Sequence, residues 1–441
     1  MNVLLLTQSS GSHIIPIKPL VTELKKKNHI VYCLSTINNK GLIKEVGAKF
    51  IEYPFNLVPD QEKNRQAIDM MEKVNQLWQE GKVAQGYDTF IEEDTALMFD
   101  VTIEQMLLVQ KILKEKKIQL IFRDAVDKLG HYLAQTNQIP EVGYITHNLY
   151  SAAFFEQDPN YYYAVFMDAK NRVKKLPENY FADFRKKSDI AYQFYSQKKG
   201  NFPLFTHHEF DPMSEYTLIF TTDSLQPKIS FEPNRQYQIV FPDFNRFTPE
   251  EEIEENLKEF VEQKQTIIYL SSGSLIPQSI HYYFNFIDTF NGNQNEIGFV
   301  ISCEKFKDEL NEYVIEKNKK SAIYIGGYLP QQYLLSNASL FITHGGQNSI
   351  IEAIYHQVPI AVTPMTSEQR LNGLMVEFLG IGKTLYQIST KIISIGKVFE
   401  ELLTSRKIKE SLFNCSLEIK NSQNDFTQMW AYIEDEQNRL K

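Results

Sequence analysis

The chain is poor in cysteine and has no excess of positive charge, and both features exclude broad classes of protein. Its three cysteines, Cys33, Cys303 and Cys415, lie far apart and form no CxxC or Cys/His cluster. This spacing favours reduced thiols over a disulfide framework or a zinc site. The formal net charge of −9 argues against a nucleic acid or an anionic membrane as a partner.

Long apolar runs are also absent. No stretch approaches the roughly 18 apolar residues that are needed to span a bilayer. The apolar run 3–6 follows no basic segment, so it predicts a first strand and not a signal peptide. We therefore expect a cytoplasmic protein without a membrane span.

At 441 residues the chain is too long for one ordinary core, and its pattern indicates two α/β domains. Short apolar runs alternate with helical periods, which is typical of parallel, doubly wound sheets. The predicted strands are 3–6, 29–34, 50–53, 118–122, 142–145, 216–220, 266–270, 298–302, 322–325 and 340–342. Prolines between 227 and 242 indicate a linker. We predict domains over 1–228 and 229–420, and a helix over 421–441 that packs back on the first domain.

The most informative segment is 341–373. Its apolar strand breaks at His344-Gly345-Gly346 and continues as a helix, so several backbone N–H groups converge at the helix start. These groups lack partners within the helix, and the helix dipole is positive there, so the turn is a potential anion site. Asn348 and Ser349 add side-chain donors beside it.

Glu352 adds an acceptor to this site. It lies three residues after Ser349 and four after Asn348, near their face of the helix, and it can accept hydrogen bonds from hydroxyls. Phosphates beside a diol describe a nucleotide. The alternative is that Glu352 is an ordinary solvated helix residue.

These residues resemble the UDP-sugar-dependent, inverting family-1 glycosyltransferases of the GT-B fold, in which two Rossmann-like doubly wound domains face a cleft. The resemblance covers nearly the whole chain and is sharpest over 11–16, 269–275, 328–331 and 341–369. It looks closest to the bacterial macrolide and natural-product branch, where the donor motif commonly ends in Glu-Gln, as Glu368-Gln369 does here.

The resemblance implies a role for each matching residue in binding the UDP-sugar donor. The donor residues are Tyr328 and Gln331 for the uracil and ribose, His344, Gly346, Asn348, Ser349, Gly273 and Ser274 for the diphosphate, Glu352 for the ribose hydroxyls, and Glu368 and Gln369 for the transferred sugar. Two positions depart from the family. Tyr328 replaces a common Trp but keeps an aromatic face for stacking, and Ser272 replaces a bulkier loop residue.

The chemistry requires a base, because an alcohol is a poor nucleophile unless its proton is removed during attack. His13, in the first loop, suits a general base, and Asp124 ends another strand of the same sheet, where it can fix the histidine tautomer. The family has a His–Asp dyad at the matching positions. The alternatives are that His13 is a surface or capping residue and that Asp124 caps a helix, with Asp127 close enough to be confused with it.

We expect a metal-independent enzyme without a cofactor, because none of the 18 aspartates heads a D-x-D motif. The predicted function is transfer of a hexose to a hydroxyl of a small lipophilic or aromatic acceptor, and the resemblance implies, through Gln369, that the hexose is glucose. The preference for an apolar or aromatic acceptor is inferred from the aromatic-rich segment 154–195. The alternatives are a sugar-nucleotide epimerase or hydrolase of the same fold, and a non-catalytic UDP-sugar-binding protein. The acceptor and the oligomeric state, monomer or homodimer, stay open.

Overall fold

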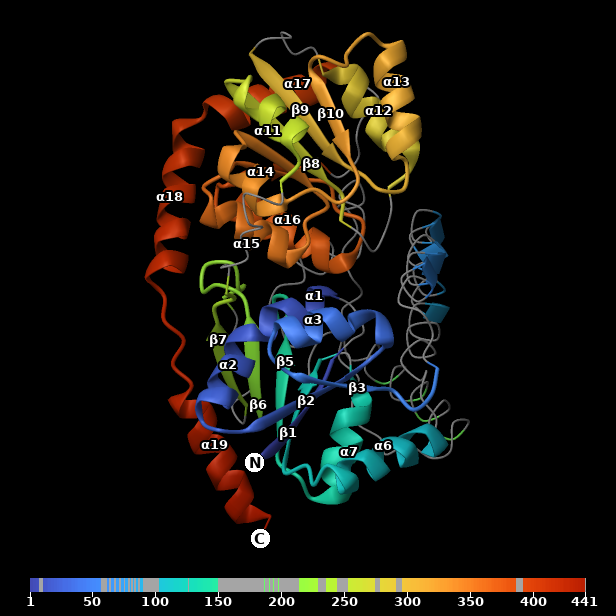
Figure 1. The fold of residues 1–441 in the computed structure, drawn as a ribbon, viewed down its shortest axis with the longest axis vertical. Coiled ribbons are helices and arrows are strands. Elements are labelled where there is room, and N and C mark those ends of the chain that lie inside the picture. The colour runs from blue at the N-terminus through green and yellow to red at the C-terminus, as the bar shows by residue number, and fades with distance from the viewer. Residues whose placement is uncertain are drawn as a thin grey trace. The chain divides into compact units, whose positions relative to one another are not determined.

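The chain folds into two compact units (Figure 1). The computed structural model describes residues 1–7, 11–56, 103–125, 127–149, 214–228, 235–243, 253–273, 278–290, 296–385 and 392–440, with single residues between 62 and 89 and between 186 and 197. The first unit comprises Met1–Asp243 and Gln423–Lys441, and the second comprises Phe244–Ser422. Each is built on one parallel sheet.

The first sheet has the strand order β3-β2-β1-β4-β5-β6-β7. Its strands are β1 (Asn2–Leu6), β2 (Ile30–Ser35), β3 (Lys49–Glu52), β4 (Leu120–Asp124), β5 (Glu141–Ile145), β6 (Tyr216–Phe220) and β7 (Gln236–Val240). Val3 and Leu5 of β1 belong to one core cluster, whereas Leu4 and Leu6 belong to another. A strand covered on both faces needs apolar side chains on both, which is why β1 is an unbroken apolar run.

Helices cover both faces of this sheet. One core cluster includes side chains of α2 (Lys18–Lys26), α3 (Lys40–Glu45) and α19 (Thr427–Arg439). The other includes side chains of α6 (Ile103–Glu115) and α7 (Lys128–Asn137). The short helices α1 (Gly11–Ile14), Ile15–Ile17 and Ile37–Asn39 follow β1 and β2.

The C-terminal helix α19 is part of the core of the first unit (Figure 1). Met429 and Ile433 are buried in the same cluster as α2 and β1. The Trp430 indole Nε1 donates to Glu23 Oε1 of α2 at 3.0 Å, and the Tyr432 ring stacks on Tyr216 of β6 with centroids 5.1 Å apart. The last segment of the chain therefore returns to the unit in which the chain begins.

The second sheet has the strand order β10-β9-β8-β11-β12-β13. Its strands are β8 (Thr266–Ser271), β9 (Ile297–Ser302), β10 (Ile323–Gly326), β11 (Leu340–Thr343), β12 (Ile360–Val362) and β13 (Gly382–Thr384). The helices are α11 (Glu255–Glu262), α12 (Ile280–Thr289), α13 (Lys307–Glu316), α14 (Gln331–Asn337), α15 (Gln347–Tyr355), α16 (Ser367–Phe378), α17 (Ile392–Thr404) and α18 (Arg406–Asn421).

The segment 227–242, predicted as a linker, instead contains strand β7. Its residues pair in parallel with β6, and Tyr237 and Ile239 pack against a small core cluster. β7 is an edge strand, a position that tolerates flanking prolines, and its compact unit continues to Asp243. In the part of the chain that the structure describes, no helix is long and apolar enough to cross a membrane.

Candidate active site

The first unit brings His13 and Asp124 into direct contact. His13 lies in α1, directly after β1, and Asp124 is the last residue of β4, which pairs with β1. The two side chains therefore meet at the carboxyl edge of adjacent strands. His13 Nδ1 lies 2.6 Å from Asp124 Oδ2, and the Asp124 side chain is fully buried. A buried carboxylate at this distance orients the ring and favours the imidazolium that forms when Nε2 accepts a proton.

The structure also separates the roles of the two neighbouring aspartates. Asp127 is the N-cap of α7, and its carboxylate accepts a hydrogen bond from the Gly130 N–H at 3.0 Å. Asp124 instead contacts His13. The helix-capping alternative therefore applies to Asp127 and not to Asp124.

A buried ion pair anchors the end of β4. Arg123 Nε donates to Glu141 Oε2 at 3.0 Å, while its other nitrogens donate to Ser214 Oγ at 3.1 Å and to the Asp127 carbonyl at 3.3 Å. Burial opposes ionisation of Glu141, but the charge of Arg123, with a second contact from a histidine, lowers its pKa to about 2. Arg123 of β4 therefore connects Glu141 of β5, Ser214, which lies two residues before β6, and the loop after Asp124.

Sequence reasoning missed two neighbours of His13. Thr146 Oγ1 lies 3.1 Å from His13 Nδ1, and the buried His147 ring is edge-on to the His13 ring with centroids 6.3 Å apart. Burial, with a smaller effect of charge on His13, lowers the pKa of His147 to about 4, so His147 is neutral near pH 7. Thr146 and His147 could have been found from the sequence, because they directly follow the buried strand β5 at the edge of the sheet where ligands bind.

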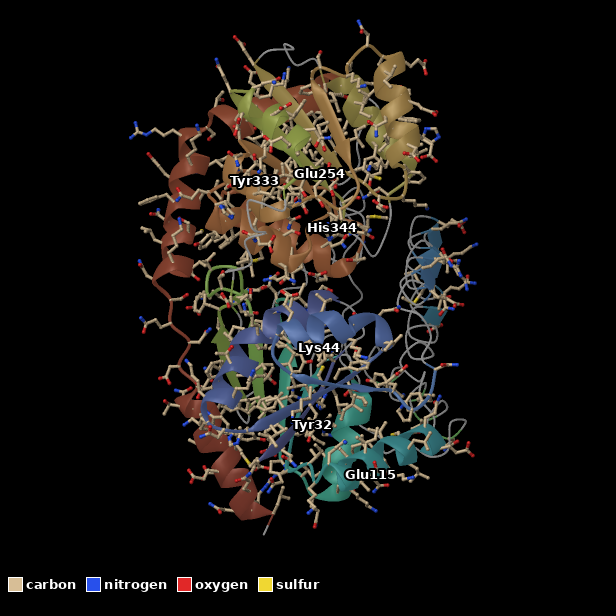
Figure 2. The ribbon with its side chains drawn as sticks, in the orientation of Figure 1. Tyr32, Lys44, Glu115, Glu254, Tyr333 and His344 are labelled. Atoms are coloured by element: carbon tan, nitrogen blue, oxygen red, sulfur yellow. The ribbon has the colours of Figure 1, made fainter. Side chains whose placement is uncertain are left out.

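In the second unit, the turn between β11 and α15 forms the predicted helix opening. His344, which is labelled in Figure 2, is the first residue of this turn. Gly345 adopts φ +93°, which is favourable only for glycine. Gly346 is the N-cap of α15, and no side chain caps this helix start. The first N–H groups of the nine-residue helix, where Asn348 lies, are therefore not satisfied by a capping side chain, as an anion site requires.

Two glycines make room for the His344 ring. A Cβ on Gly273 would lie 2.6 Å from His344 Cε1, and a Cβ on Gly346 would lie 2.6 Å from His344 Nε2. Burial lowers the pKa of His344 to about 4, although a hydrogen bond with the Ser271 backbone opposes the shift. His344 is therefore neutral near pH 7, and its single N–H donates to the Ser271 backbone. Its second ring nitrogen donates to a ligand only when the ring is protonated.

The structure brings the predicted ribose residues together. The Gln331 side-chain amide, at the start of α14, donates to Ser349 Oγ at 3.3 Å and to Glu352 Oε2. Both acceptors lie on α15, three residues apart on one face. Gln331 therefore orients the Glu352 carboxylate, which argues against Glu352 as an ordinary solvated residue.

Gln369 has a structural role that the sequence did not reveal. It forms a capping box with Thr366 at the start of α16, and its Oε1 accepts hydrogen bonds from the N–H groups of Met365 at 2.9 Å and Thr366 at 3.2 Å. The side-chain NH₂ is the part of Gln369 that this cap does not use. Glu368 is partly exposed one residue earlier and accepts a hydrogen bond from Asn372 at 2.9 Å.

The remaining predicted residues are Tyr328, in the base-binding segment, and Ser272 and Ser274, in the loop after β8. Tyr328 follows β10 and is 80% exposed, so its ring is open for stacking. Ser272 Oγ lies 2.5 Å from the Tyr283 hydroxyl, so a tyrosine of α12 packs against the small loop residue. Ser274 lies outside the described residues, as does nearly all of the aromatic segment 154–195.

Residues 2–421 match the family described as UDP-glucoronosyl and UDP-glucosyl transferase. The chain belongs to this family. NDP-glycosyltransferase YjiC of Bacillus licheniformis is 21% identical over 388 residues, which cover 87% of this chain and 84% of that protein. UDP-glucuronosyltransferase 2A3 of Cavia porcellus is 25% identical over 402 residues, or 81% of this chain and 69% of that protein.

Other relatives match over shorter stretches. The uncharacterized UDP-glucosyltransferase YojK of Bacillus subtilis is 24% identical over 201 residues, which cover 44% of this chain and 46% of that protein. Among solved structures, the glycotransferase of kitacinnamycin is similar with a TM-score of 0.69 at 17% identity, over 100% of this chain and 98% of the other. The calicheamicin glycosyltransferase CalG4 has a TM-score of 0.65 at 16% identity, with the same coverage. The fold of this member of the family is therefore GT-B.

Proposed function

We propose that the protein is a UDP-glycosyltransferase that moves a hexose, with glucose as the favoured sugar, from a UDP-sugar to a hydroxyl of a small lipophilic acceptor. The observation that carries the proposal is the 2.6 Å contact between His13 Nδ1 and the buried Asp124 carboxylate. A binding protein has no need of an imidazole held this way, whereas transfer to an alcohol needs a base.

His13 is the proposed general base. With Nδ1 engaged by Asp124, Nε2 takes the acceptor proton while the acceptor oxygen attacks the anomeric carbon. Attack opposite the leaving diphosphate inverts the anomeric centre. The positive charge that develops on His13 is stabilised by the buried Asp124 carboxylate.

The proposed stabilisation of the leaving UDP comes from hydrogen-bond donors at the start of α15. Backbone N–H groups suit the growing negative charge on the diphosphate. That charge also favours protonation of the His344 ring, whose second ring nitrogen then donates to the diphosphate. The absence of a D-x-D motif from the whole sequence supports a reaction that does not need a metal. Chelation with EDTA should therefore leave the rate unchanged, and loss of activity would refute this part of the proposal.

Donor selection is assigned to the second unit. Tyr328 stacks on the uracil, Glu352 binds the ribose hydroxyls, and Glu368 and Gln369 bind the transferred sugar. The exposed ring of Tyr328 and the orientation of Glu352 by Gln331 support these roles. Because Gln369 Oε1 is used in the helix cap, its NH₂ donates to a sugar oxygen while Glu368 accepts from a hydroxyl.

UDP release from UDP-glucose, measured with and without a panel of phenols, flavonoids and macrolides, tests the proposal. Release that depends on the acceptor, with a glycosylated product of inverted configuration, is the expected result. Release without any acceptor would identify a hydrolase or epimerase, and binding of UDP-glucose without release would identify a binding protein. Either of these last two outcomes would overturn the transferase proposal.

A further inference from the structure

Asn372 connects two parts of the candidate donor site through a single nitrogen. It lies on α16, one turn after Glu368, and is 1% exposed. Its Nδ2 donates to Glu368 Oε1 at 2.9 Å and to the Gly345 carbonyl at 2.9 Å. An amide NH₂ has two hydrogens, and both are used by these acceptors. The bond to the carboxylate is charge-assisted and therefore the stronger of the two.

The two acceptors belong to segments with different proposed ligands. Glu368 is partly exposed at the start of α16, where the transferred sugar is assigned. Gly345 is in the positive-φ turn that leads into α15, where the diphosphate is assigned. A carboxylate in place of the Asn372 amide would put a third oxygen between two acceptors, so the site requires a donor there.

We propose that Asn372 is a positioning residue for donor-sugar recognition: it holds the Glu368 carboxylate in a fixed relation to the diphosphate-binding turn. The inference rests on the proposed function, in which Glu368 binds hydroxyls of the hexose. A carboxylate held by a buried neighbour accepts from a sugar hydroxyl without first losing rotamer freedom. Loss of Asn372 should therefore weaken binding of UDP-glucose far more than binding of UDP, because UDP has no hexose.

The test compares UDP-glucose with UDP as calorimetric ligands of the full chain. Asn372→Asp keeps the side-chain shape but removes both donated hydrogens. We expect it to raise the Kd of UDP-glucose by about 10- to 100-fold and that of UDP by less than about 3-fold. Asn372→Ala, which removes the donors without adding a charge, should move both constants in the same directions. Asn337→Asp is the matched control, because Asn337 Nδ2 donates to the exposed Tyr333 carbonyl of α14 at 2.9 Å and touches neither segment.

A second variant distinguishes positioning from general support of the fold. In a Glu368→Gln background, the new side-chain amide at position 368 can donate to the carboxylate that Asn372→Asp introduces. There, Asn372→Asp should change the UDP-glucose Kd by less than about 3-fold. Equal losses for UDP and UDP-glucose, or effects that simply add in the double variant, would overturn the assignment to Asn372. If the wild-type chain bound UDP but gained nothing from the hexose and released no UDP with any acceptor, the proposed function itself would fail.

Discussion

His13 and His344 each follow a buried strand at the carboxyl edge of their own sheet, yet their surroundings differ. His13 lies 2.6 Å from the buried Asp124 carboxylate. His344 packs between Gly273 and Gly346 and bonds to the Ser271 backbone, and burial lowers its pKa to about 4. A carboxylate partner suits a ring that gains a proton from the acceptor, whereas a desolvated ring among neutral groups stays neutral until a bound anion favours its protonation. Position in the fold brings both rings to a ligand edge, and the neighbours decide their chemistry.

The largest effect should come from His13→Ala. Removal of the general base should lower kcat by about 10²–10⁴-fold, because the acceptor hydroxyl must then lose its proton without help. The Kd of UDP should stay unchanged, since the donor residues are assigned to the other unit. Steady-state rates with the best acceptor and calorimetry with UDP measure the two quantities.

His344→Ala is the matched histidine variant for this comparison. It should weaken UDP binding by about 3- to 10-fold, which corresponds to one hydrogen bond, and lower kcat less than His13→Ala does. If the two variants gave the same pattern, the contrast between a base and a donor would be wrong.

The next largest effect concerns the carboxylate that distinguishes His13. Asp124→Asn keeps the shape of the side chain but removes the charge that favours the imidazolium, so kcat should fall by about 10–10³-fold. Asp127→Asn is the matched control, because it also replaces a carboxylate with an amide, at the N-cap of α7, where Asn caps a helix as well as Asp does. Its kcat should stay within about 2-fold of wild type. A larger loss for Asp127→Asn than for Asp124→Asn, in the same rate assay, would reverse the assignment.

The contact between His13 and Asp124 could be predicted from the sequence because it depends on a general rule of parallel sheets. Apolar runs as strong as 3–6 and 118–122 predict buried parallel strands, and residues after such strands meet at one edge of the sheet. The His344 turn is local in sequence, so its helix opening was also predictable. Among the strands that the structure describes, three were not predicted. β12 and β13 have only three residues each, and β7 lies among prolines.

Side-chain partners far apart in sequence were less accessible. The resemblance assigns Gly273 and Gly346 to the diphosphate, and the structure shows that they also make room for the His344 ring. Nothing in the sequence indicates which ring fills that space. Asn372 lies four residues after Glu368, which is a helical contact spacing, but its bond to Gly345 depends on how α16 packs beside the turn.

The smallest effect is a difference between wild type and His344→Gln in how the unfolding free energy depends on pH. Its folded-state pKa of about 4 lies below the ordinary value of 6.5, so between these pH values the unfolded ring takes up a proton and the folded ring does not. Folding stability from this residue is therefore full above pH 6.5 and falls as the pH decreases towards 4. Between pH 7 and pH 5 the wild type should lose about 2 kcal/mol more unfolding free energy than His344→Gln, measured by urea titration at both pH values. The buried His147, with its own pKa of about 4, titrates alike in both proteins and cancels in the difference. An equal loss in wild type and variant would mean that His344 gains a proton in the folded state as readily as in the unfolded chain, and the two rings would then differ less than their neighbours imply.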